Sequence, residues 1–157
     1  MDISVLINST RINVRVAVLT FFDNAVIFEK DKNGFYFPIG GRIKVNETSI
    51  DAAIREVNEE IQYSIANPKF AGIIENYFIY DSINFHEICF VYWVDVPHRL
   101  MLPPHFRHIN ISDVTKYDIR PAIMVEIMKD RDHLHHFIVN DKNTQHSNAR
   151  EPPSPSR

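Results

Sequence analysis

The stretch from Gly41 to Tyr63, GRIKVNETSIDAAIREVNEEIQY, constrains the fold of this chain more than any other. Thr48 with Asp51 three residues later resembles a capping box, so a helix is expected to begin at Thr48 or Ser49. Its apolar residues recur at helical spacing, which at about 100° per residue places them on one face that can dock on a core. These residues are Ile50, Ala53, Ile54, Val57 and Ile61.

Charged residues crowd the second half of the same segment. Glu56 and Glu60 lie one helical turn apart beside the apolar stripe, so their carboxylates can converge on one point. Glu59 lies further round the helix, four residues after Arg55, whose guanidinium can hold that carboxylate by a charge-assisted hydrogen bond. Such a cluster is either a solvated, salt-bridged helix face or a cation site. Glu47 and the glycine pair upstream favour the cation site, because a surface helix would not require them.

The ligand chemistry indicates which cation such a site would hold. Carboxylate oxygens suit Mg²⁺ or Mn²⁺, and Mg²⁺ is commonly held by a few carboxylates together with substrate phosphates. No Cys or His joins the cluster, which argues against zinc. Just upstream, Phe37-Pro38-Ile39-Gly40-Gly41 supplies a strand end, a rigid proline and two glycines whose backbone can approach a metal or a phosphate. A backbone carbonyl from this turn, at Gly40, is expected to complete the coordination.

At these residues a resemblance becomes specific. The pattern Gly, five residues, Glu, seven residues, Arg-Glu-apolar-any-Glu-Glu-any-Gly-apolar is the signature of the MutT-like Nudix hydrolases. The segment from Gly41 to Tyr63 resembles it at every defined position but one, Gln62, where the family has glycine. A glycine there lets the chain leave the helix in a left-handed conformation, which costs a non-glycine residue about 1 kcal/mol. Gln62 therefore bears on the exit turn and not on the ligands.

The resemblance implies a fold and an activity. The fold is α/β, a Nudix-type α/β/α sandwich with a mixed β-sheet between helices. The implied activity is hydrolysis of a phosphoric anhydride bond, the diphosphate linkage of a nucleoside diphosphate joined to another group, with Mg²⁺ or Mn²⁺ as cofactor. The alternative is a non-catalytic Nudix-like module that binds and senses a nucleotide. Loss of box carboxylates would favour that alternative, and all of them are present.

The resemblance also implies roles for the charged residues of the box. Glu56 and Glu60 are the metal ligands of first choice. Glu59 is either a further metal ligand or the catalytic group that handles the proton of the attacking water. Arg55 is the residue that orients the carboxylates. The sequence leaves the choice between base and ligand open for Glu59.

The rest of the chain predicts a sheet and a second helix. Alternating β-branched and aromatic runs between turn residues indicate strands on both sides of the first helix. Pro121 opens a second helix, which is expected to cover the opposite face of the sheet. The strands are expected at residues 13–22, 25–29, 35–37, 69–80, 84–96 and 105–109.

Length and composition predict one folded domain and a small-molecule partner. Residues 1–139 form the predicted Nudix domain, whereas residues 140–157 have almost no apolar side chains and are expected to be a disordered tail. The net charge of −3 gives no broad basic field, which argues against stable binding to nucleic acid or anionic membrane. With no signal peptide and no long apolar run, we expect a cytoplasmic monomer or homodimer that binds a nucleotide diphosphate.

Substrate-binding residues are expected outside the box. Glu87 lies on the same strand face as Cys89, a predicted packing residue, and either faces water at a strand end or contacts metal or substrate. The same two alternatives apply to Glu75, with a weaker argument for contact with metal or substrate. Tyr36 and Tyr80 are candidates to stack on a base, although aromatic residues in strands more often pack in the core. Tyr80 also lies near the position of a tyrosine that is typical of family members acting on dinucleoside polyphosphates. The histidines at 133, 135 and 136 lack a zinc-ligand pattern and are assigned no site.

Overall fold

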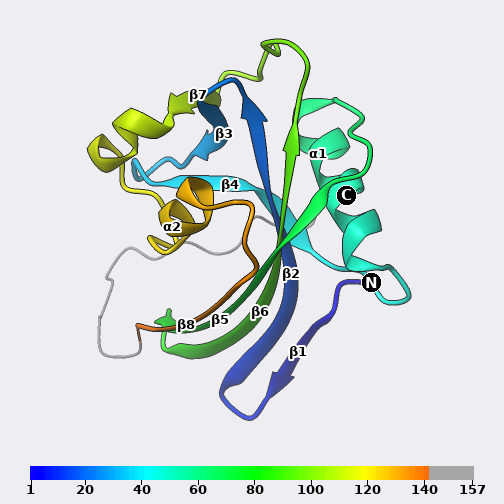
Figure 1. Cartoon of the computed structure of the whole chain (residues 1–157). Coiled ribbons are helices and arrows are strands. Elements are labelled where there is room, and N and C mark those ends of the chain that lie inside the picture. The colour runs from blue at the N-terminus through cyan, green and yellow to red at the C-terminus, as the bar shows by residue number, and fades with distance from the viewer. Residues whose placement is uncertain (142–157) are drawn as a thin grey trace.

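The computed structural model describes residues 1–141. Its strands form one mixed sheet in the order β7-β3-β4-β2-β6-β5-β8, and β1 pairs with the beginning of β2 (Figure 1). The strands are β1 (Ser4–Ile7), β2 (Thr10–Phe22), β3 (Ala25–Lys30), β4 (Tyr36–Arg42), β5 (Lys69–Tyr80), β6 (Ile83–Asp95), β7 (Phe106–Asn110) and β8 (His135–Asn140). The helices are α1 (Ser49–Ile61), the 3₁₀ helix η1 (Ile111–Lys116) and α2 (Met124–Lys129).

The long strand β2 organises the sheet. It pairs antiparallel with β4 over residues 15–18 and parallel with β6 along most of its length, and β6 in turn forms an antiparallel pair with β5. In this register Arg15 lies opposite Arg42 on β4 and opposite Cys89 on β6. Segments that are far apart in the sequence thus meet around the middle of β2.

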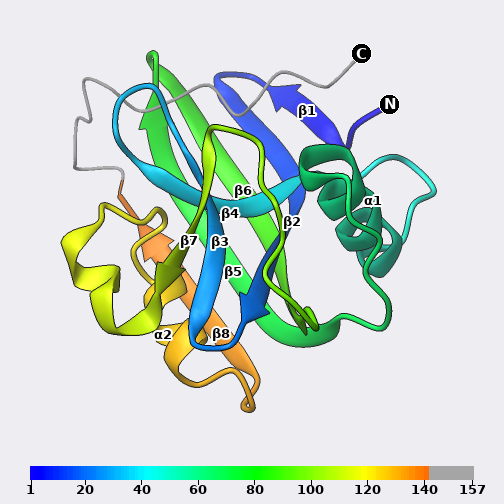
Figure 2. The same ribbon diagram turned by 90° about the horizontal axis from the view of Figure 1, so that it is seen from above.

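Helices cover both faces of the sheet, with α1 on one side and α2 on the other (Figure 2). Alternate residues of β2 serve the two layers, because successive side chains of a strand point to opposite faces. Val16 and Val18 pack in one apolar cluster with Ala53 and Val57 of α1. On the other face, the alternate β2 residues pack with α2 in a second cluster, which includes Ala17, Leu19, Phe21, Met124 and Ile127. The predicted mixed sheet between helices is confirmed.

Helix α1 begins where the sequence predicts. Thr48 is its extended N-cap, and the Thr48 Oγ1 accepts a hydrogen bond from the Asp51 amide at 3.2 Å. The Asp51 carboxylate accepts a bond from the same hydroxyl at 2.6 Å, so both partners of the cap are satisfied. One residue of the predicted stripe is wrong: Ile50 is 40% exposed, because it lies in the first turn at the edge of the docked face. Ala52 is fully buried in its place.

Gln62 ends α1 in the left-handed conformation, with φ 53° and ψ 37°. Its amide donates to the Asn58 carbonyl at 2.9 Å, so the turn is formed despite the missing glycine.

We expect Gln62→Gly to raise the free energy of unfolding by up to about 1 kcal/mol, because glycine adopts this conformation without a Cβ penalty. Urea denaturation of the two proteins gives the sign. Asn58→Gly, inside the helix, is the matched control and should destabilise by about 0.3 kcal/mol, because glycine is a poorer helix former than asparagine. A destabilised Gln62→Gly protein would contradict this account of the helix end.

The structure corrects the predicted turn at Phe37–Gly41. These residues lie within β4, and the glycines pair with Ala17 and Val16 of β2. The chain leaves the sheet only after Arg42. The predicted strand stopped too early because glycine and proline are usually strand breakers.

Three further elements were not predicted: β1, η1 and β8. Strand β8 pairs parallel with the edge of β5, and it includes Asn140, which the sequence assigned to the tail. Residues 142–157 of that predicted tail lie outside the described part of the chain.

Candidate active site

The carboxylates of Glu56 and Glu60 lie against the two consecutive glycines of β4. The Glu60 Oε1 accepts a long hydrogen bond of 3.4 Å from the Gly40 amide. A Cβ placed on Gly41 would lie 2.4 Å from the Glu56 Oε1 and 2.6 Å from its Oε2. Only glycine at position 41 therefore lets the Glu56 carboxylate come this close to the strand. The helix face and the strand together bring the two carboxylates to one place.

Arg55 fixes the loop before the helix and one of these carboxylates. Its Nε and Nη2 donate to the two oxygens of Glu47 at 2.6 and 2.9 Å, a bidentate pair. Its Nη1 donates to Glu56 and, at 3.2 Å, to Glu59, and its Nη2 also reaches the Arg42 carbonyl at 3.1 Å. The hydrogen bonds between Arg55 and Glu47 lower the pKa of the Glu47 carboxyl and raise the pKa of the Arg55 guanidinium. Arg55 thus contacts Glu47 and Glu56 as well as Glu59, the carboxylate that the sequence predicted it to hold.

Glu59 is more exposed than the neighbouring carboxylate of Glu56. It is 34% exposed along its side chain and forms ion pairs with Arg55 and, at 3.8 Å, with Lys44. Among residues 1–141, no three His, Cys, Asp or Glu side chains converge as a ready cation site. The geometry brings Glu56 and Glu60 together and leaves Glu59 on the outer side of the helix.

Desolvation disfavours the ionised forms of the Glu56 and Glu60 carboxyl groups. Desolvation, together with the nearby charges of Glu29 and Glu56, raises the pKa of Glu60 to about 8. Desolvation also raises the pKa of Glu56, against the opposing hydrogen bond from Arg55. A positive charge between these carboxylates would remove this penalty.

The raised pKa predicts how stability depends on pH in a chelator. The folded protein holds the Glu60 proton up to about pH 8, while an unfolded glutamate loses it near pH 4.5. The contribution of the protonated Glu60 to the free energy of unfolding is therefore complete below pH 4.5. It is lost progressively as the pH rises from 4.5 through 8. Between about pH 6.5 and 8, we expect the free energy of unfolding to fall by up to about 1.4 kcal/mol per pH unit.

Urea denaturation in EDTA at several pH values measures this slope. Glu60→Gln should flatten it, because the amide does not titrate. A wild-type profile as flat as that of the variant would contradict the raised pKa.

The residues present fit a divalent cation. The Glu60 Oε2 is buried and, within the described residues, has no hydrogen-bond partner. Such an orphaned oxygen costs free energy unless a ligand binds it. Glu56 and Glu60 would hold the ion with the Gly40 carbonyl, an all-oxygen donor set suited to Mg²⁺ or Mn²⁺.

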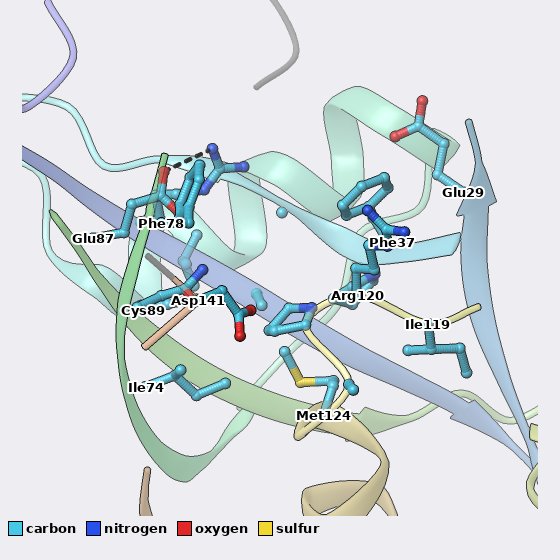
Figure 3. A pocket seen from close by; sticks show the side chains of 18 of the residues that line it. Glu29, Phe37, Ile74, Phe78, Glu87, Cys89, Ile119, Arg120, Met124 and Asp141 are labelled. Atoms are coloured by element: carbon cyan, nitrogen blue, oxygen red, sulfur yellow. Dashed lines mark ion pairs between the residues drawn. The ribbon is translucent and has the colours of Figure 1, made fainter. Parts of the chain in front are cut away.

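A pocket of about 390 Å³ adjoins the candidate cation centre, which is formed by Glu56, Glu60 and Gly40 (Figure 3). It lies on the α2 side of the sheet and reaches β4 at Gly40. Glu87 and its ion pair with Arg15 lie on one side of the pocket, and Glu29 and Phe37 lie on the other. Most of its wall is apolar, so it offers room for a flat or apolar group beside the carboxylates.

Comparison with known proteins decides the family. Residues 11–130 match the family model for the NUDIX domain, which covers most of the chain and includes the whole box. The chain belongs to the NUDIX family. The prediction of a Nudix hydrolase acting on phosphoric anhydride bonds is confirmed by this match. Among curated proteins, no sequence matches the chain significantly.

Solved structures agree with the fold of this NUDIX domain. A MutT protein from Bacillus halodurans matches with a TM-score of 0.67 and 19% identity, over 79% of this chain and 86% of that one. A NUDIX hydrolase from Nitrosomonas europaea gives 0.60 and 18%, over 82% and 79%. The Ap4A hydrolase of C. elegans gives 0.58 and 12%, over 77% and 96%. At these identities the likeness shows the fold alone.

The substrate-binding residues predicted from the sequence are only partly brought together. Glu87 is 8% exposed and lines the pocket, where the Asn13 amide donates to its Oε1 at 2.9 Å. Tyr36 is 6% exposed and packs edge-to-face on Tyr117, so its burial favours the packing role. Tyr80 packs near Phe85 at the end of β5 and does not line the pocket.

Other candidate side chains have partners elsewhere. Glu75 pairs with the His136 Nε2 at 2.6 Å. His133 pairs with Asp130, whose hydrogen bond raises the pKa of the imidazole, and His135 contacts the Asp130 backbone. None of the helices in residues 1–141 has the length and apolar character that a membrane span requires.

Sequence reasoning missed two residues near the centre, Glu29 and Arg15. Each lies on a strand outside the box, in a position where a charged residue usually faces solvent. Only the pairing of β3 with β4 and of β2 with β6 brings them to the pocket. A charged residue inside an alternating apolar strand is the one signal that could have indicated Arg15.

Proposed function

We propose that this NUDIX domain hydrolyses a diphosphate linkage in a nucleoside diphosphate joined to another group, with Mg²⁺ or Mn²⁺ as cofactor. One observation carries the proposal: the buried carboxylate of Glu56 and the half-buried carboxylate of Glu60 meet at a glycine pair beside a pocket large enough for a small ligand. A structural helix would have no use for the unpartnered Glu60 oxygen. The solved MutT protein and Ap4A hydrolase of the same fold are consistent with a nucleotide substrate.

Each side chain has a defined task in this proposal. When bound, the cation neutralises phosphate oxygens and lowers the pKa of a water molecule. Glu56 and Glu60 hold the ion, and Arg55 keeps Glu56 in place through its ion pair. Glu59 is a further ligand or accepts the proton of the attacking water. Its exposed position suits the second task, because a base must exchange its proton with solvent after each turnover.

The pocket binds the organic part of the substrate. Its apolar wall covers the flat face of a base. Glu87 positions the Arg15 guanidinium, with which it forms an ion pair at 3.7 Å. The protein is proposed to act in the cytoplasm as a monomer or homodimer on a free nucleotide.

A substrate screen tests the proposal. Nucleoside triphosphates, nucleotide sugars, ADP-ribose and dinucleoside polyphosphates are incubated with the protein and Mg²⁺ or Mn²⁺, and the products are separated by anion-exchange chromatography. We expect cleavage of at least one compound within its phosphate chain and none in EDTA. Tight binding of a nucleotide without cleavage of any compound would reject the enzyme and favour a sensing module.

A further inference from the structure

Two arginines lie side by side on the sheet next to the carboxylates. Arg15 of β2 is directly opposite Arg42 of β4, and facing residues of such a pair have Cβ atoms about 5 Å apart. Their side chains are only 18% and 17% exposed. Because like charges facing each other destabilise a sheet, this placement opposes folding. Burial and the charge of Arg15 accordingly lower the pKa of Arg42.

Neither guanidinium donates a hydrogen bond to any other side chain or backbone group in the described part of the chain. Arg15 has an ion pair with Glu87 at 3.7 Å, and Arg42 has one with Asp2 at 3.8 Å. Both distances exceed the hydrogen-bond range. The Arg42 Nε is also fully buried and has no hydrogen-bond partner among residues 1–141. A guanidinium has five N–H donors, and leaving so many unpaired in a half-buried place is costly unless an anion binds them.

The location of this arginine pair relates it to the centre. Arg15 lines the pocket together with Gly40 and interacts electrostatically with both Glu56 and Glu60. Arg42 follows Gly40 by two residues, so it lies on the same strand face about 7 Å further along. A ligand at the carboxylates can therefore reach the arginine pair only if it extends in that direction.

The support behind Arg15 indicates that its position is specified. Glu87 is buried, and the Asn13 amide holds its Oε1 at 2.9 Å on the same strand face as Arg15. The carboxylate sits beside the guanidinium without accepting its hydrogen bonds. The donors of Arg15 are thus oriented yet available.

We propose that Arg15 and Arg42 bind a phosphate group beyond the two phosphates held at Glu56 and Glu60, so that the substrate is a nucleotide with a chain of at least three phosphates. This inference rests on the proposed function. The guanidinium fork matches phosphate oxygens in geometry, and the two fixed positive charges need no additional cation. A nucleoside diphosphate sugar leaves the arginine pair empty.

Isothermal titration calorimetry with non-hydrolysable, methylene-bridged analogues of ADP and ATP tests the inference in Mg²⁺. For the wild-type protein, we expect the triphosphate analogue to bind at least about tenfold more tightly than the diphosphate analogue. Arg15→Gln and Arg42→Gln should each weaken the triphosphate analogue about tenfold and the diphosphate analogue less than about threefold. Arg15→Lys should lie between, because it keeps the charge and loses the fork.

Arg107→Gln, on the exposed face of β7, is the matched control and should leave both affinities unchanged. Thermal denaturation checks that each variant is folded. Equal affinity of the wild-type protein for the two analogues, or an equal loss for both in the arginine variants, would overturn the inference. Cleavage of diphosphate-linked compounds in the screen would still support the proposed function in that case. Conversely, triphosphate binding that depends on the two arginines, without cleavage of any compound, would reject the proposed hydrolase activity. It would still support a phosphate-binding site at Arg15 and Arg42.

Discussion

Replacing Glu60 by glutamine is expected to lower turnover by at least about 100-fold, because even the outer-shell partners of a metal site are worth 10- to 100-fold. The amide has the shape of the carboxyl group but is a poor ligand for a hard cation. Since desolvation raises the pKa of Glu60 to about 8, the metal-free fold already favours a neutral side chain there. The variant should therefore unfold at the same or a higher urea concentration than the wild-type protein at neutral pH.

The measurement is the rate of cleavage of the best substrate from the screen, at saturating Mg²⁺ or Mn²⁺. Glu126→Gln on the exposed side of α2 is the matched control, because it removes one exposed carboxylate that does not line the pocket and should leave the rate unchanged. Calorimetric titration of the metal supplies a second readout, in which Glu60→Gln should show weaker binding. A variant that keeps both the rate and the metal affinity of the parent would remove Glu60 from the centre.

The sequence was sufficient for the parts of this site that depend on local order. The apolar spacing of the box and its capping residues determine where α1 begins and which face it buries, and the structure confirms both apart from Ile50. The i, i+4 relation between Glu56 and Glu60 also follows from helix geometry alone. Their shared approach to the glycines is consistent with that relation.

The parts that depend on strand register could not be predicted in the same way. Pairing of Arg15 with Arg42 needs the alignment of β2 and β4, and Glu87 reaches Arg15 only because β6 runs parallel to β2. Sequence patterns give the faces of a strand but not its neighbours. Strand β8 was missed for a related reason, since its alternating side chains lie at the edge of the sheet and include two histidines.

Replacing Gly41 by alanine is expected to leave the protein folded and to lower turnover by about 10- to 100-fold, a loss typical of displaced support around a metal site. The added methyl group would meet the Glu56 carboxylate at 2.4 to 2.6 Å, which is too close for any real contact. That carboxylate is the far end of a flexible side chain, so it can move away at little cost to folding. Its movement would take Glu56 away from Glu60 and strain its ion pair with Arg55. The cleavage rate and the urea midpoint together measure the effect.

Gly40→Ala is the matched comparison, because the neighbouring glycine faces a different obstacle. Its added Cβ would lie 2.2 Å from the Val16 carbonyl oxygen and 3.0 Å from the Ala17 Cα, both in the backbone of β2. A strand in the middle of the sheet cannot shift to relieve this overlap, so the variant should lose about 3 kcal/mol or more of stability. The two substitutions thus separate the roles of the glycine pair. Gly40 permits the pairing of β4 with β2, and Gly41 makes room for the Glu56 carboxylate. Loss of folding in Gly41→Ala, or a stable Gly40→Ala protein, would show that this division is wrong.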